Sequence, residues 1–285
     1  MGTSRTALGA AALSLAGLIL TGIVALALPV GRSLDATTLH GFMGLDRPIV
    51  DPLSHFFIQV GSPVIYAFLG ALITIFALRH RQRRLAVAIV VILFGSVVSA
   101  ESLKLLLAGS RPEDWIAPGW SIGDASWPSG HATAAMTLSM CAIMASPPAW
   151  RHLTAAAGAA LTIAVSYSLV IVGGHLPSDV IGAFFLSALW TSLAVAVRRR
   201  HQEELTPSPW RSFLRRSLPA YTVTWGIGAS LVLALVIARP ETVIGYVPGH
   251  ETFLVGALLV ALIAQAVITG FARLLSTGVG DASSV

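Results

Sequence analysis

The stretch Pro128-Ser129-Gly130-His131 introduces a run of small and apolar residues that extends over positions 132–145. Proline tolerates the first turn of a helix, and a serine hydroxyl can cap backbone N–H groups that have no partner there. Glycine lets a ligand approach the backbone closely. The N–H groups and positive dipole at a helix start favour an anion such as phosphate. The stretch therefore predicts a helix whose first turn can bind an anion beside His131.

The composition places this helix in a membrane. Of the 285 residues, 55% are hydrophobic and 11% are charged, whereas a soluble domain carries about a quarter charged residues. The mean hydropathy is +0.80. The basic residues, which give a pI near 10.1, gather at the ends of apolar runs, a pattern that indicates membrane topology rather than a nucleic-acid partner. Cys141 is the single cysteine, which excludes a disulfide within the chain and a thiol-rich metal site.

Apolar runs of the length that a bilayer requires recur along the whole chain. We predict eight spans, at 7–30, 62–78, 85–108, 130–147, 153–173, 178–197, 219–238 and 252–272. The predicted fold is therefore an all-α integral membrane protein, in which 1–198 forms a six-span core and 219–285 a two-span extension. A basic linker, 199–218, separates the two parts.

The segment 31–61 is too polar, and too interrupted by Gly, Pro and Asp, to span a membrane. We expect it to lie on the outer surface, where an apolar face at helical spacing would rest on the membrane. The residues of that face are Leu53, Phe56, Phe57 and Val60.

The distribution of basic residues predicts the orientation of the spans. With both termini in the cytoplasm, most arginines fall on the cytoplasmic side, as the positive-inside rule requires. The basic residues left on the outer side are Arg32, Arg47, Lys104, Arg111 and Arg239. Under this topology three groups of polar residues lie at the outer face. One follows the third span, one opens the fourth, and one lies between the fifth and the sixth.

Three polar motifs occur in a fixed order along the core. Lys104 and Arg111-Pro112 come first, Pro128-Ser129-Gly130-His131 follows, and His175 with Asp179 comes last. This order resembles the three signature motifs of the type 2 phosphatidic acid phosphatase superfamily, membrane lipid phosphatases related to vanadium haloperoxidases. The resemblance covers residues 31 to 198.

A phosphomonoester reaction needs charge neutralisation, an in-line nucleophile and a proton for the leaving oxygen, and two histidines can divide the last two tasks. The resemblance implies that His175 is the nucleophile, that Asp179 orients it, and that His131 is the general acid. It further implies a set of groups that hold the phosphoryl oxygens: Lys104, Arg111, and backbone N–H groups near Ser129 and Gly130. Glu101, three residues before Lys104, can hold its ammonium group in place.

The third motif departs from the family at one position. The family has Ser-Arg at its start, whereas this chain has Ser168-Leu169, and leucine offers phosphate no hydrogen bond. Arg239, which ends the seventh predicted span, is a candidate substitute cation if the extension docks against the core. Its alternative role is that of an interfacial anchor at a helix end.

The resemblance implies a lipid phosphate phosphatase that acts at the outer face through a phosphohistidine, with no cofactor and no metal. Its partners would be membrane lipids and a lipid phosphate substrate, either phosphatidic acid, phosphatidylglycerol phosphate or a polyprenyl (di)phosphate. The sequence does not select among these substrates, and it leaves the oligomeric state open. Two other functions use the same pocket: a weakly catalytic or non-catalytic protein that binds or transports a lipid phosphate, and a lipid phosphotransferase.

Overall fold

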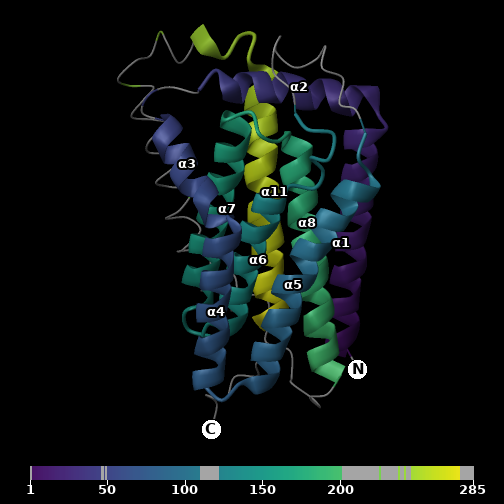
Figure 1. The fold of residues 1–285 in the computed structure, drawn as a ribbon, viewed down its shortest axis with the longest axis vertical. Helices are drawn as coiled ribbons and strands as arrows, with labels where there is room; N and C mark the ends of the chain where they lie inside the picture. The colour runs from purple at the N-terminus through teal and green to yellow at the C-terminus, as the bar shows by residue number, and fades with distance from the viewer. Residues whose placement is uncertain are drawn as a thin grey trace.

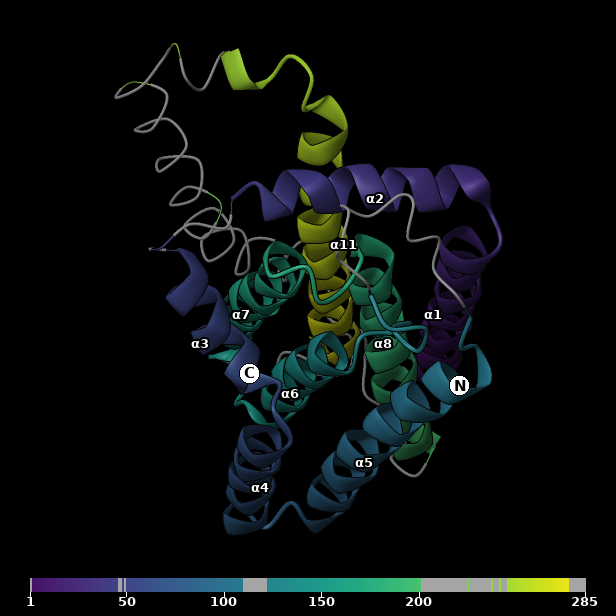
Figure 2. The same cartoon turned by 45° about the horizontal axis from the view of Figure 1, so that its top comes forward.

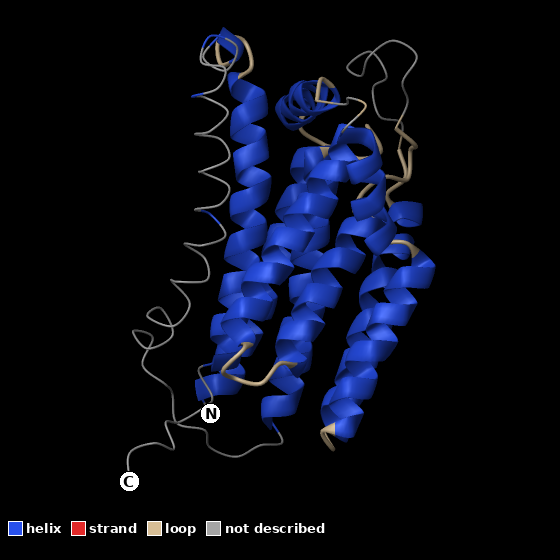
Figure 3. Cartoon of the chain, turned by 90° about the vertical axis from the view of Figure 1, so that its left-hand side faces the viewer, coloured by secondary structure: helices blue, strands red, loops and turns tan. Residues whose placement is uncertain are grey.

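The computed structural model describes residues 2–45, 48, 50–109, 122–200, 225, 237, 241 and 245–276. Over these residues the regular structure is helical, with no strand (Figure 3). Most helices run side by side along the long axis of a bundle (Figure 1). The helices are α1 (Gly2–Leu26), α2 (Pro29–Met43), α3 (Val50–Val60), α4 (Pro63–Arg79), α5 (Arg83–Leu106), α6 (Gly130–Ala145), α7 (Arg151–Ile171), α8 (Pro177–Arg200) and α11 (Glu251–Ser276).

The apolar helices confirm a membrane architecture but not all of the predicted spans. Five described helices are long and apolar enough to cross a bilayer, namely α1, α5, α7, α8 and α11. A sixth arises if α3 and α4, which meet at a 53° bend, count as one span. At 16 residues, α6 is shorter than the run of 130–147 suggested, because Ser146 leaves the helical conformation. The predicted span 219–238 falls almost entirely outside the described residues.

The segment 31–61 forms two helices that pack more closely on the bundle than the sequence indicated. Helix α2 lies across one end of the bundle (Figure 2), where Leu39 and Phe42 are fully or almost fully buried. The predicted apolar face of α3 is divided. Its residues Phe57 and Val60 pack against the main core, whereas Leu53 and Phe56 are more than half exposed.

Hydroxyl groups join the three helices that carry the polar motifs. The Thr137 hydroxyl of α6 lies 3.2 Å from Ser96 Oγ of α5 and 3.0 Å from Ser187 Oγ of α8. All three residues are buried, so these hydrogen bonds form in an apolar environment where alternative partners are scarce. The contacts fix α5, α6 and α8 relative to one another, deeper in the bundle than the helix ends that carry the motifs.

The last described helix, α11, packs into the same core as the motif-bearing helices. Its residues Val260, Ala264 and Ile268 are fully buried in the cluster that also contains Val165 of α7 and Val180 of α8. Its first turn meets α2, where Phe253 stacks edge-on against Phe42. This part of the predicted extension therefore docks directly on the core, whereas the division of the chain at 199–218 stays a prediction.

Candidate active site

The first two motifs meet where α5 ends and α6 begins. Lys104 Nζ lies 2.7 Å from Glu101 Oε1, which is the ion pair that the three-residue spacing predicts. A Cβ at Gly130 would lie 2.9 Å from Glu101 Oε1 and 3.0 Å from Lys104 Nζ. Glycine at this position therefore lets the Lys104 ammonium group pack directly on the first turn of α6.

Ser129 caps α6, as the sequence predicts, but its backbone N–H has a different role from the expected one. The Ser129 side chain accepts a hydrogen bond from Ala132 N at 3.4 Å. Its own N–H donates to the carbonyl oxygen of Asp179 at 3.0 Å, so it is engaged by α8 rather than directed at a ligand. The N–H groups of Gly130 and His131 follow it, and neither has a partner within the helix. These two can bind an anion.

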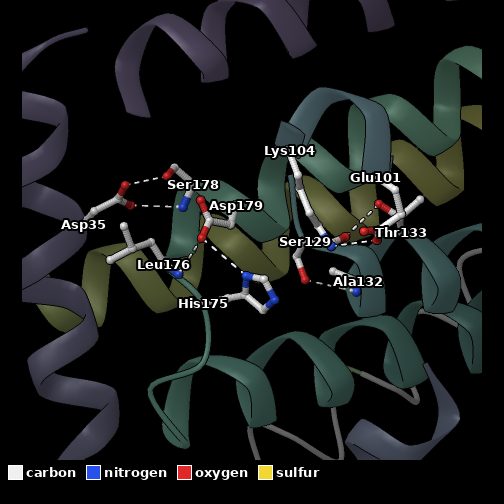
Figure 4. Close-up of polar contacts among 10 residues, drawn as sticks. All are labelled: Asp35, Glu101, Lys104, Ser129, Ala132, Thr133, His175, Leu176, Ser178 and Asp179. Carbon is white, nitrogen blue, oxygen red and sulfur yellow. Dashed lines mark hydrogen bonds and ion pairs between the residues drawn. The ribbon is translucent and has the colours of Figure 1, made fainter. Parts of the chain in front are cut away.

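The third motif forms a histidine–carboxylate pair at the start of α8. Pro177 begins the helix and places Asp179 in its first turn, as the sequence predicts. Asp179 is fully buried, and its Oδ2 accepts from Leu176 N at 3.0 Å and lies 3.4 Å from His175 Nδ1. With a proton on Nδ1 facing the carboxylate, the lone pair of His175 is on Nε2. Figure 4 shows the ring between Asp179 and the start of α6.

His131 completes the cluster from the first turn of α6. Its imidazole lies within electrostatic range of His175, Lys104 and Glu101, so both histidines and the cation share one site. Six of the predicted site residues are described, and they lie at this same end of the bundle: Lys104, Ser129, Gly130, His131, His175 and Asp179. The predicted Arg111 and Arg239 lie outside the described residues.

Leu169 is buried in the main apolar core, with 4% of its surface exposed. Its backbone oxygen accepts from Gly174 N at 3.0 Å and so helps to close the turn that leads to His175. The position at which the family has an arginine therefore holds, as the sequence predicts, an apolar side chain, and this side chain packs in the core.

Gly61 packs against His131, a contact that the sequence motifs do not indicate. It lies in the turn between α3 and α4, and a Cβ built on it would be 2.8 Å from both Cα and Cβ of His131. The close approach involves the backbone of His131, which cannot move aside without shifting the imidazole. An isolated glycine near a proline is too common in turns for the sequence alone to reveal this contact.

Comparison with known proteins identifies the family. The PAP2 superfamily model matches residues 85–203. An undecaprenyl-diphosphatase from Sulfolobus acidocaldarius is 30% identical over 146 residues, which cover 50% of this chain and 68% of that protein. The chain belongs to the PAP2 superfamily. The PAP2 match contains all three motifs, whereas α1 to α4 and α11 lie outside it.

The PAP2 fold is also found among solved structures. The crystal structure described as that of the first transmembrane PAP2 type phosphatidylglycerolphosphate phosphatase from Bacillus subtilis superposes with a TM-score of 0.58. The two sequences are 17% identical, and the superposition covers 68% of this chain and 98% of the other. The two proteins therefore share their fold, and this PAP2 protein is a multi-pass membrane protein.

Proposed function

We propose that this PAP2 protein removes a phosphoryl group from a membrane lipid phosphate or diphosphate. The observation that carries the proposal is the His175–Asp179 pair, whose ring lies between a buried carboxylate and the start of a helix beside Lys104. The two similar proteins support the substrate class, since one is named an undecaprenyl-diphosphatase and the other a phosphatidylglycerolphosphate phosphatase.

The geometry favours a two-step reaction. Nε2 of His175 attacks phosphorus as the bond from phosphorus to the lipid oxygen breaks, and His131 donates a proton to that oxygen. Asp179 stabilises the positive charge on the His175 ring. His131 then takes a proton from water, which attacks the phosphohistidine, releases inorganic phosphate and restores His175. Lys104 and the N–H groups of Gly130 and His131 neutralise the phosphoryl oxygens in both steps.

In this mechanism the protein itself supplies the charge neutralisation, so we propose that no metal takes part. Arg111 and Arg239, which lie outside the described residues, stay candidates for further cations at the phosphate. Leu169 cannot contribute one, and charge-assisted hydrogen bonds from arginine are worth about 1.5–3 kcal/mol each. Turnover slower than that of an arginine-containing relative is therefore consistent with the proposal.

Release of inorganic phosphate by purified protein tests the function directly. The substrates are phosphatidic acid, phosphatidylglycerol phosphate and a polyprenyl diphosphate in detergent micelles, each with and without EDTA. We expect release from at least one of them, unaffected by EDTA. Tight binding of a lipid phosphate without release would favour the binding or transport function, and release only on addition of an alcohol acceptor would favour the phosphotransferase.

The contact of Gly61 with His131 gives a prediction about the general acid. In Gly61→Ala the added methyl group must displace His131, and misplacement of a catalytic group by about 1 Å can cost roughly 100-fold in rate. We expect kcat to fall by at least about tenfold. Gly270→Ala is the matched control, because a Cβ there has no neighbour within 4 Å. Equal kcat values for the two variants would show that the turn does not position His131.

We also propose that the site faces outward, which the positive-inside pattern supports. Ala125 is exposed in the loop before α6, and Gln82 is exposed between α4 and α5 at the opposite end of the bundle. An impermeant thiol reagent applied to intact cells should label Ala125→Cys and not Gln82→Cys. The native Cys141 is buried and gives little background. The reverse labelling pattern would overturn the orientation.

A further inference from the structure

The end of the bundle that carries the proposed site residues Lys104, His175 and Asp179 is here called the catalytic end. Asp35 is a carboxylate buried at this end. It belongs to α2, the helix that lies across this end, and 6% of the residue is exposed. Helix α2 is held there by Leu39 and Phe42, which share an apolar cluster with Leu176, the residue after His175. Burial of a carboxylate is costly unless its oxygens accept hydrogen bonds. The partners of Asp35 therefore indicate what its burial achieves.

Both carboxylate oxygens of Asp35 bond to one residue at the start of α8. The backbone N–H of Ser178 donates to Oδ1 at 3.0 Å, and the Ser178 hydroxyl donates to Oδ2. Figure 4 shows Asp35 and Asp179 on either side of this first turn. Asp35 thus holds the residue that immediately precedes Asp179 in the chain.

The sequence around the start of α8 explains why a distant carboxylate is needed. Leu176, which precedes the first residue Pro177, occupies the N-cap position and offers no side-chain acceptor for the N–H groups of the first turn. Asp179 at the third position bonds back to Leu176 N, which is one half of a capping box. Asp35 supplies the missing acceptor from another helix.

We propose that Asp35 is a positioning residue for the phosphoryl-transfer site. It fixes the first turn of α8 through Ser178, and this turn holds the Asp179 carboxylate against Nδ1 of His175. Asp35 precedes the region 85–203 that matches the PAP2 model, so an N-terminal helix outside the match completes the catalytic end. The inference rests on the proposed function of His175 as the nucleophile.

The expected effect of Asp35→Ala is on kcat rather than on KM. Without the acceptor, the first turn of α8 loosens and Asp179 no longer holds the His175 ring in line with phosphorus. We expect kcat to fall about 10- to 100-fold while KM changes less than about twofold, because Lys104 and the α6 start still bind the phosphoryl group. The measurement is steady-state phosphate release on the best substrate of the panel.

Asp35→Asn separates positioning from a requirement for negative charge. The amide oxygen can still accept from Ser178 N, and the Ser178 hydroxyl can reorient to accept from the amide N–H. We therefore expect Asp35→Asn to keep kcat within about threefold of the wild type. A loss as large as that of Asp35→Ala would overturn the positioning role.

Two further variants complete the test. Ser178→Ala removes the hydroxyl bond but keeps the backbone bond, and we expect a loss in kcat of about fivefold. It decides the question if Asp35→Ala does not fold, since a wild-type kcat for Ser178→Ala would then contradict the proposal. Asp51→Ala is the matched control, because Asp51 pairs with His55 on the exposed surface of α3. Its kcat should equal that of the wild type.

The wild-type protein measured in parallel distinguishes this inference from the proposed function. If the wild type releases no phosphate from any lipid of the panel, the proposed function fails, and the inference fails with it. If the wild type is active and a folded Asp35→Ala variant matches its kcat, the inference alone is wrong.

Discussion

His175→Ala should reduce phosphate release on the order of 10⁴-fold or more, because the variant has no group that can accept the phosphoryl group. Phosphate binding should persist, since Lys104 and the start of α6 are unchanged. Inorganic phosphate should therefore still protect the variant against thermal unfolding in detergent. The measurements are phosphate release and the melting temperature with and without phosphate.

The control for this variant is His55→Ala. His55 lies on α3, has 63% of its side chain exposed, forms an ion pair with Asp51 and has no role in the proposed mechanism. Its removal should leave kcat unchanged. Near-normal hydrolysis by a folded His175→Ala protein would remove the nucleophile from the account and leave its mechanism without support.

Lys104→Met is the change with the second largest expected effect. Methionine keeps most of the length of the side chain but removes the ammonium group that lies beside Gly130. Loss of one group that stabilises developing charge typically costs about 10²- to 10³-fold in rate. We expect a decrease of this size in kcat/KM for phosphate release, together with weaker inhibition by inorganic phosphate.

Arg79→Met is the matched control for the lysine variant. Arg79 is an exposed cation at the C-terminal end of α4, which lies at the end of the bundle opposite to α2 and the proposed site (Figure 1). It should retain the kcat/KM of the wild type. If Lys104→Met loses less than about threefold, Lys104 serves only to anchor the end of α5 and pairs with Glu101 for structural reasons.

Contacts within a few residues of each other were predictable from the sequence. The Glu101–Lys104 pair follows from helical spacing, the Ser129 cap from residue type, and the start of α8 from Pro177. The convergence of the motifs at one end was predictable from hydropathy, because the number of spans between them fixes the end of the bundle at which each motif lies. The family model and the relatives confirm the superfamily that these motifs indicated.

Contacts between distant parts of the chain were not predictable. Asp35 and Ser178 are 143 residues apart, and no periodicity links them. The polarity of 31–61 indicated a surface segment, yet that polarity includes the Asp35 carboxylate, which is buried against the start of α8. The N–H groups near Ser129 and Gly130 were predicted to hold phosphate, but the N–H of Ser129 itself bonds to the backbone carbonyl oxygen of Asp179. The pairing of two helix starts depends on tertiary packing rather than on local sequence.

The most direct test of the account is to trap the phosphoenzyme. Purified protein is mixed with a lipid phosphate or diphosphate labelled with ³²P on its terminal phosphoryl group, quenched in alkali, and digested to locate the label. We predict an acid-labile label on the peptide that contains His175. When unlabelled substrate is added with water as the sole acceptor, this label should be released as inorganic phosphate. The label should be absent in His175→Ala. Hydrolysis by the wild type with no labelled histidine, or with equal labelling of His175→Ala, would contradict the central claim.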